Sequence, residues 1–246
     1  MALITRFIEK AKKDGVLTAV STAAKYCSDT TMQRIRPALM NSYSQFGEDL
    51  EIEKAVGKKE NGFYVDVGAN DPNQISNTKR FYKKGWTGIN IEPNFENYQK
   101  FVNERPQDIN LNIGIGPQDG EAKFYIFDPN ELSTFSQEEA QKYQKLGYKL
   151  ESEKDVRIIP LWKVLEEHAQ GKEVDFLSVD AEGYDLEVLK SNNWERFRPK
   201  VLCVEIAEHG SGKKQAGVEE FLTKIEYTLV KFNGLNGVYR DSRNRR

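Results

Sequence analysis

The stretch Phe63-Tyr64-Val65-Asp66-Val67-Gly68-Ala69-Asn70 decides the fold class of this 246-residue chain. Its apolar residues predict a short buried strand, and the glycine that follows permits a tight turn. Working outward, further strands alternate with helical patterns. The expected strands are 88–92, 109–115, 175–180 and 201–207, and the expected helices are 77–84, 95–105, 161–168, 186–191 and 218–225. This alternation is typical of an α/β fold with a mostly parallel sheet and helices on both faces.

The alternation breaks in the middle of the chain. A strand is expected at 121–127, followed by a polar loop of about 25 residues and a further strand at 156–160. A loop of this length in a compact domain is usually functional, so residues 128–155 are the expected source of substrate specificity. At the other end of the chain, 227–232 and 237–240 are expected to pair as a hairpin.

Composition excludes several classes of protein. The chain is 38% hydrophobic and 11% aromatic, which is too apolar for a disordered protein. No apolar run approaches the roughly 18 residues that a membrane span needs. The net charge is −2, whereas a dedicated nucleic-acid binder is usually basic, so no nucleic-acid partner is expected. Two distant cysteines predict neither a disulfide framework nor a metal cluster.

The first 40 residues differ from the rest of the chain. They carry seven Lys or Arg against three acidic residues, and their apolar residues recur at helical spacing. We therefore expect an amphipathic helical extension over 1–40 and a main domain over 41–246. The extension could pack on the main domain, pack on a second subunit to form a homo-oligomer, or contact a membrane surface. Charges interrupt the pattern of a signal peptide, which favours a cytoplasmic protein.

The loop after the first strand carries the signature of a nucleoside-binding site. Glu92 closes the next strand, 24 residues after Gly68, where an acidic side chain can bind both hydroxyls of an adenosine ribose. The alternative is that Asp66 and Glu92 only cap the helices that follow. Asp66 and Asp71 bracket a loop without Lys or Arg, which would repel a pyrophosphate and attract a cationic ligand. S-adenosylmethionine (SAM) has that charge, whereas NAD and ATP do not.

Residues 43–210 resemble the FkbM-type SAM-dependent methyltransferases. Four segments carry the resemblance: Ser44-Gln45-Phe46-Gly47-Glu48-Asp49, Phe63 to Asn70, Gly85 to Pro93, and Asp175 to Gly183. The resemblance implies a Rossmann-like class I methyltransferase fold with a seven-stranded sheet. It also implies methylation of a hydroxyl on a sugar, glycan or secondary metabolite, so the expected partner is a small-molecule or glycan acceptor.

The resemblance places SAM-binding roles on Asp66, Gly68 and Glu92. Asn70 stands where broader class I enzymes often have a second glycine, and it completes the set of cofactor-binding candidates.

Two hypotheses describe the chemistry at the acceptor, because an aliphatic hydroxyl is a poor nucleophile and a base or a metal ion is expected; the remaining alternative is that the enzyme only positions the acceptor. In the first, Asp180, Glu205 and Glu208 bind Mg²⁺ through carboxylate oxygens. In the second, His209 or Glu182 removes the proton directly. Asp180, Glu182 and His209 are thus the catalytic candidates.

Two rival functions remain open from the sequence. One is a non-catalytic SAM-binding module with a regulatory or docking role, in which the basic N-terminus is the docking element. The other is an NAD-dependent oxidoreductase, which the acidic loop disfavours. Carboxylates at the ends of both late strands favour an enzyme over a regulatory module.

Overall fold

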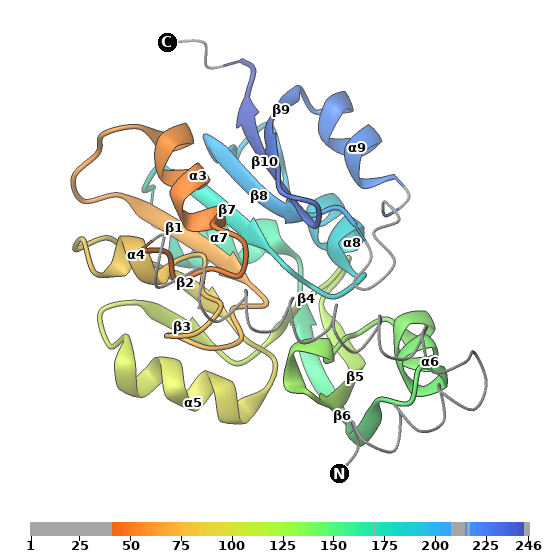
Figure 1. Ribbon diagram of the computed structural model, residues 1–246. Helices are drawn as coiled ribbons and strands as arrows, with labels where there is room; N and C mark the ends of the chain where they lie inside the picture. The colour runs from red at the N-terminus through yellow and green to blue at the C-terminus, as the bar shows by residue number, and fades with distance from the viewer. Residues whose placement is uncertain (1–40, 170, 208–214, 216, 244–246) are drawn as a thin grey trace, which may run out of the picture.

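The computed structural model describes residues 41–169, 171–207, 215 and 217–243, and its centre is a seven-stranded sheet (Figure 1). The strand order is β3-β2-β1-β7-β8-β10-β9, and β10 runs in the opposite direction to the other six strands of this sheet. The strands are β1 (Phe63–Val67), β2 (Thr87–Ile91), β3 (Ile109–Leu111), β7 (Phe176–Val179), β8 (Val201–Glu205), β9 (Tyr227–Phe232) and β10 (Asn236–Asp241). The predicted mostly parallel sheet and the predicted C-terminal hairpin are confirmed.

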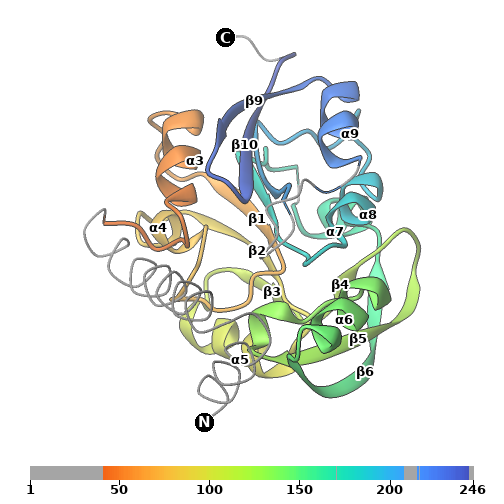
Figure 2. The same ribbon diagram turned by 45° about the vertical axis from the view of Figure 1, so that its right-hand side comes forward.

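Helices cover both faces of this sheet (Figures 1 and 2). One side carries α3 (Glu48–Val56), α4 (Lys79–Tyr82) and α5 (Phe95–Glu104), and the other carries α7 (Leu161–His168), α8 (Asp185–Lys190) and α9 (Val218–Lys224). Successive residues of a strand point to opposite faces. Tyr64 therefore packs with the α3 and α4 side, whereas Val65 packs with α7, α8 and α9. All five residues of β1 are buried, as a strand in the middle of a parallel sheet requires.

A second, three-stranded sheet lies beside the first and corrects two predictions. It is ordered β4-β6-β5, and η1 and α6 lie between β5 and β6 in the sequence. Its strands are β4 (Gly114–Ile115), β5 (Gly120–Asp128) and β6 (Lys149–Ile159), and the two helices are η1 (Asn130–Leu132) and α6 (Gln137–Lys145).

The predicted single strand 109–115 is wrong, because β3 and β4 belong to different sheets. Asn112 lies between β3 and β4 in the sequence, and its side chain donates to the carbonyls of Glu92 and Pro93.

The predicted long loop is also wrong, for a reason visible in the burial pattern. Among the residues of α6, only Ala140 and Tyr143 are buried, so the helix has almost no apolar periodicity. Most of β6 is exposed, and only its last two residues are fully buried. β6 is held in place by its pairing with β5 rather than by an apolar pattern of its own.

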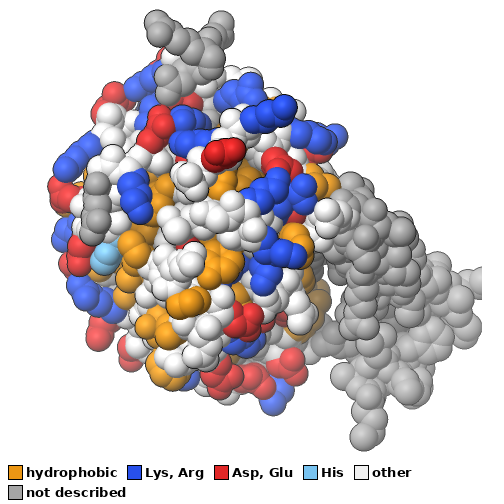
Figure 3. All heavy atoms as spheres, turned by 90° about the vertical axis from the view of Figure 1, so that its left-hand side faces the viewer, with side chains coloured by type: hydrophobic (Ala, Val, Ile, Leu, Met, Phe, Trp, Pro, Cys, Tyr) orange, Lys and Arg blue, Asp and Glu red, His pale blue; other side chains and the backbone are white. Residues whose placement is uncertain are grey.

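The predicted extension 1–40 lies outside the described residues, so its division from the main domain remains a prediction. Among the described residues, no helix has both the length and the apolar character needed to cross a bilayer. Figure 3 views the molecule from the left-hand side of Figure 1, and acidic, basic and apolar side chains are interspersed over the described part of that face.

Candidate active site

The loop after β1 lies directly against the end of β7. Gly68 has φ of 76°, and a Cβ atom there would be 1.9 Å from the carbonyl oxygen of Asp180. The Asp180 amide donates to the Val67 carbonyl (3.0 Å), and the Gly68 amide donates to the Ile91 carbonyl (3.0 Å). Glycine is required because both its φ and the close approach exclude a side chain. The contact brings the candidate cofactor loop beside the first catalytic candidate.

Glu92 holds this loop from the end of β2. Its two carboxylate oxygens accept the backbone N–H groups of Asn70 and Asn94, each at 2.7 Å. Asn70 has φ of 54°, a left-handed conformation that asparagine tolerates better than most residues. Burial raises the pKa of Glu92 to about 8. The sequence left open whether Glu92 only caps the following helix or binds a ribose. The two roles are compatible, because a carboxyl oxygen that accepts one hydrogen bond can accept a second from a ribose hydroxyl.

Of the two aspartates that bracket the loop, Asp71 differs from what the sequence led us to expect. Asp66 lies within β1, is buried and accepts a hydrogen bond from the Thr78 hydroxyl (2.9 Å). Burial raises its pKa to about 6. Asp71 forms an ion pair with Lys100 of α5 (3.0 Å). Because Lys100 is 29 positions further along the chain, the absence of Lys and Arg from the loop itself did not predict this neutralised carboxylate.

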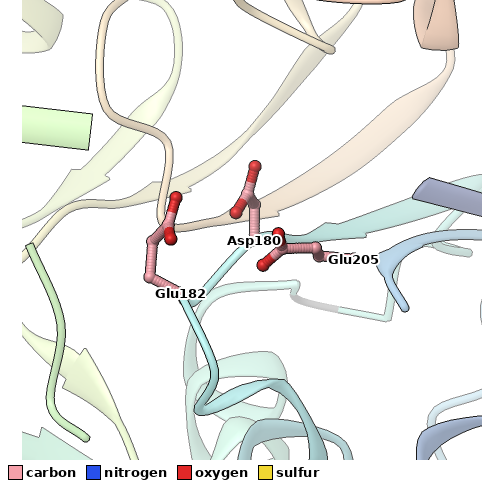
Figure 4. Close-up of side chains that lie close together, drawn as sticks. All are labelled: Asp180, Glu182 and Glu205. Atoms are coloured by element: carbon pink, nitrogen blue, oxygen red, sulfur yellow. The ribbon is translucent and has the colours of Figure 1, made fainter. Parts of the chain in front are cut away.

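Three carboxylates meet at the ends of β7 and β8 (Figure 4). Asp180 and Glu182 follow β7, whereas Glu205 is the last residue of β8. Each contributes one oxygen to a set whose members lie within 4.8 Å of one another. The cause is topological, since β7 and β8 are parallel neighbours and their carboxyl ends lie at the same edge of the sheet. We call Asp180, Glu182 and Glu205 the acid cluster.

Burial first, and then repulsion by neighbouring carboxylates, raises the pKa of every member of the acid cluster. The pKa of Asp180 rises to about 7, and those of Glu182 and Glu205 rise well above the ordinary value. Near neutral pH the cluster therefore holds a proton or binds a cation. Gln215 donates to Glu205 (3.4 Å) and to the neighbouring Asp185 (3.2 Å), whose pKa burial raises to about 6.

The structure adds residues that the sequence did not suggest. The Tyr143 hydroxyl donates to a carboxylate oxygen of Glu182 (2.8 Å), and the Thr134 hydroxyl donates to the Glu182 carbonyl (2.8 Å). Both belong to the region that was predicted to be a loop, and Tyr143 lies three positions after the other buried residue of α6. Glu208 and His209 lie outside the described residues, so their predicted roles remain predictions.

A family model agrees with this architecture. Residues 66–231 match the family model described as the methyltransferase FkbM domain. The chain therefore belongs to the FkbM methyltransferase family, and its fold is that of a Rossmann-like class I methyltransferase. No curated protein was found to match.

Two solved structures match this chain at low sequence identity. The first is the methyltransferase FkbM of Methylobacillus flagellatus KT, with 13% identity and a TM-score of 0.47 over 75% of this chain. This chain spans 44% of the length of that protein. The second is a fibrillarin/Nop5p complex, with 13% identity and a TM-score of 0.39 over 80% of this chain and 79% of that one.

Proposed function

We propose that this protein is a SAM-dependent O-methyltransferase whose acceptor is a hydroxyl group of a sugar, a glycan or a secondary metabolite. One observation carries the proposal: Gly68 of the candidate cofactor loop lies against Asp180 of the acid cluster. A cofactor held at the loop is thereby next to carboxylates that could act on an acceptor. The family supplies the reaction class, methyl transfer.

The residues of the cofactor side suit SAM. Glu92 would accept the ribose hydroxyls, and Asn70 fixes the loop on Glu92 through its backbone amide. Asp66 and the acid cluster surround the loop with carboxylates, which favour a ligand with an ammonium and a sulfonium over a pyrophosphate. SAM supplies a methyl group that is already activated on sulfur. The protein's tasks are then to align the acceptor oxygen and to remove its proton.

Two mechanisms remain for the acceptor proton. The acid cluster offers three hard oxygen ligands, which is the donor set that Mg²⁺ prefers. In this mechanism Asp180 and Glu205 hold the ion, with Glu208 as the further ligand predicted from the sequence. Alternatively Glu182, whose raised pKa makes it a better base than an ordinary carboxylate, takes the proton directly. His209 remains the second candidate for a direct base.

Calorimetry tests the cofactor. We expect SAM to bind and NAD not to bind. Glu92→Ala should lose roughly five- to a hundredfold in affinity, the equivalent of about 1–3 kcal/mol for two hydrogen bonds to the ribose at about 0.5–1.5 kcal/mol each. Glu96→Ala is the matched control, because Glu96 is exposed on the adjacent helix. Binding of NAD instead of SAM would support the oxidoreductase, and SAM binding without any transfer would support a regulatory module.

Transfer from radiolabelled SAM to a metabolite and glycan extract of cells that lack the gene tests the reaction. If Mg²⁺ acts on the acceptor, EDTA abolishes transfer, Mg²⁺ restores it, and Asp180→Asn or Glu205→Gln removes it while SAM still binds. If Glu182 is a direct base, EDTA has no effect and Glu182→Gln alone removes transfer. Full activity in EDTA with loss in His209→Ala would assign the base to His209.

A further inference from the structure

Glu182 stands in a loop that the segment between β5 and β6 holds in an unusual conformation. Its φ is 49° and that of Gly183 is 85°, so two consecutive residues adopt left-handed conformations. Such strain persists only where surrounding structure imposes it. The Thr134 hydroxyl bonds the Glu182 carbonyl, and a Cβ atom on Gly183 would lie 2.6 Å from the Glu139 side chain. The segment from η1 to α6 therefore lies directly on this loop.

Tyr143 makes the contact that reaches the carboxylate itself. Its side chain is 3% exposed and belongs to a small apolar cluster with Phe127, Leu132 and Ala140. The Tyr143 ring meets Phe127 edge-on, with 5.7 Å between ring centroids and 83° between planes. Close packing of this kind leaves the ring little freedom, so the hydroxyl is held at a fixed point 2.8 Å from Glu182.

We propose that Tyr143 is a positioning residue that holds the Glu182 carboxylate in the acid cluster, so that helix α6, between β5 and β6, forms part of the methyl-transfer site. Without this hydrogen bond, repulsion by Asp180 and Glu205 favours rotation of the flexible Glu182 side chain out of the cluster. The catalytic consequence rests on the proposed function, whereas the position of the carboxylate does not. The segment from η1 to α6 thereby takes part in the site, which its polar sequence does not indicate.

Crystal structures of Tyr143→Phe and Tyr125→Phe test the positioning directly. Tyr125 is the matched control, because it packs against the same small cluster from β5. We expect the Glu182 carboxylate to leave the acid cluster in Tyr143→Phe and to keep its place in Tyr125→Phe. An unchanged Glu182 in Tyr143→Phe overturns the proposal, and so does an equal displacement in both variants.

A double-mutant cycle tests the consequence for the reaction. Transfer from radiolabelled SAM to the extract should fall roughly ten- to a hundredfold in Tyr143→Phe, as expected when a buried carboxyl group loses its hydrogen-bond partner, while the KM for SAM is unchanged. If Tyr143 acts through Glu182, the double variant Tyr143→Phe/Glu182→Gln loses no more than Glu182→Gln alone. Additive losses overturn the proposal. Absence of transfer in the wild type contradicts the proposed function, and the crystal structures still decide the position of Glu182.

Discussion

Substitution of Gly68 by alanine should be unusually costly, and the structure provides a matched control. Gly68 and Gly85 have similar φ values, 76° and 85°, so an alanine at either position pays about 1 kcal/mol for a left-handed conformation. Nothing lies within 4 Å of a Cβ atom at Gly85, whereas one at Gly68 would lie 1.9 Å from the Asp180 carbonyl oxygen. The end of β1 must then move by more than 1 Å away from β7, since ordinary contact begins at 3.4 Å.

Such a movement stretches the hydrogen bond from the Asp180 amide to the Val67 carbonyl and pushes the loop against β2, where the Gly68 amide bonds the Ile91 carbonyl. Overpacking of this kind costs about 1–3 kcal/mol, so the unfolding free energy of Gly68→Ala should fall by roughly 3 kcal/mol and that of Gly85→Ala by roughly 1 kcal/mol. Urea denaturation measures both values, and calorimetry with SAM should show at least roughly tenfold weaker binding only for Gly68→Ala. Equal losses of stability in the two variants would refute the close approach of the loop to Asp180.

Three further predictions concern stability and organisation. Glu92 has a pKa of about 8 in the folded state against an ordinary value of 4.5, so between these values the folded state holds a proton that the unfolded state has lost. The unfolding free energy therefore falls as pH rises from about 5 to 8. Glu92→Gln should flatten this slope by up to about 1.4 kcal/mol per pH unit, and an unchanged slope contradicts the burial of Glu92. Arg105 is fully buried and donates to the hydroxyls of Ser76 and Thr78. Arg105→Met should therefore lower the unfolding free energy measured by urea denaturation by roughly 3 kcal/mol. The control Arg157→Met, at an exposed position, should change it by less than about 0.5 kcal/mol. A chain that begins at Asn41 should unfold cooperatively and bind SAM. Size-exclusion chromatography would show any loss of self-association, and vesicle flotation would show any loss of membrane binding. Failure to fold would place residues 1–40 in the core.

The main sheet was predictable because its signals are local. Parallel strands buried on both faces read as short apolar runs, and the helices between them carry apolar faces at helical spacing. Gly68 and Glu92 were identified as cofactor-binding candidates because a glycine turn and an acidic residue at a strand end can each be recognised from a few adjacent residues. The second sheet gave no comparable signal, since α6 buries only two of its residues and β6 is mostly exposed.

The sequence by itself determined the alternating fold, the resemblance to the methyltransferase family and the residue types at the strand ends. Only the tertiary structure decided which of those residues meet. Asp180 and Glu205 converge because β7 and β8 are parallel neighbours, Asp71 is neutralised by Lys100 from another helix, and Tyr143 reaches Glu182 across 39 positions of sequence. Contacts between side chains distant in sequence depend on strand order and packing, and neither is encoded in a local pattern of residues.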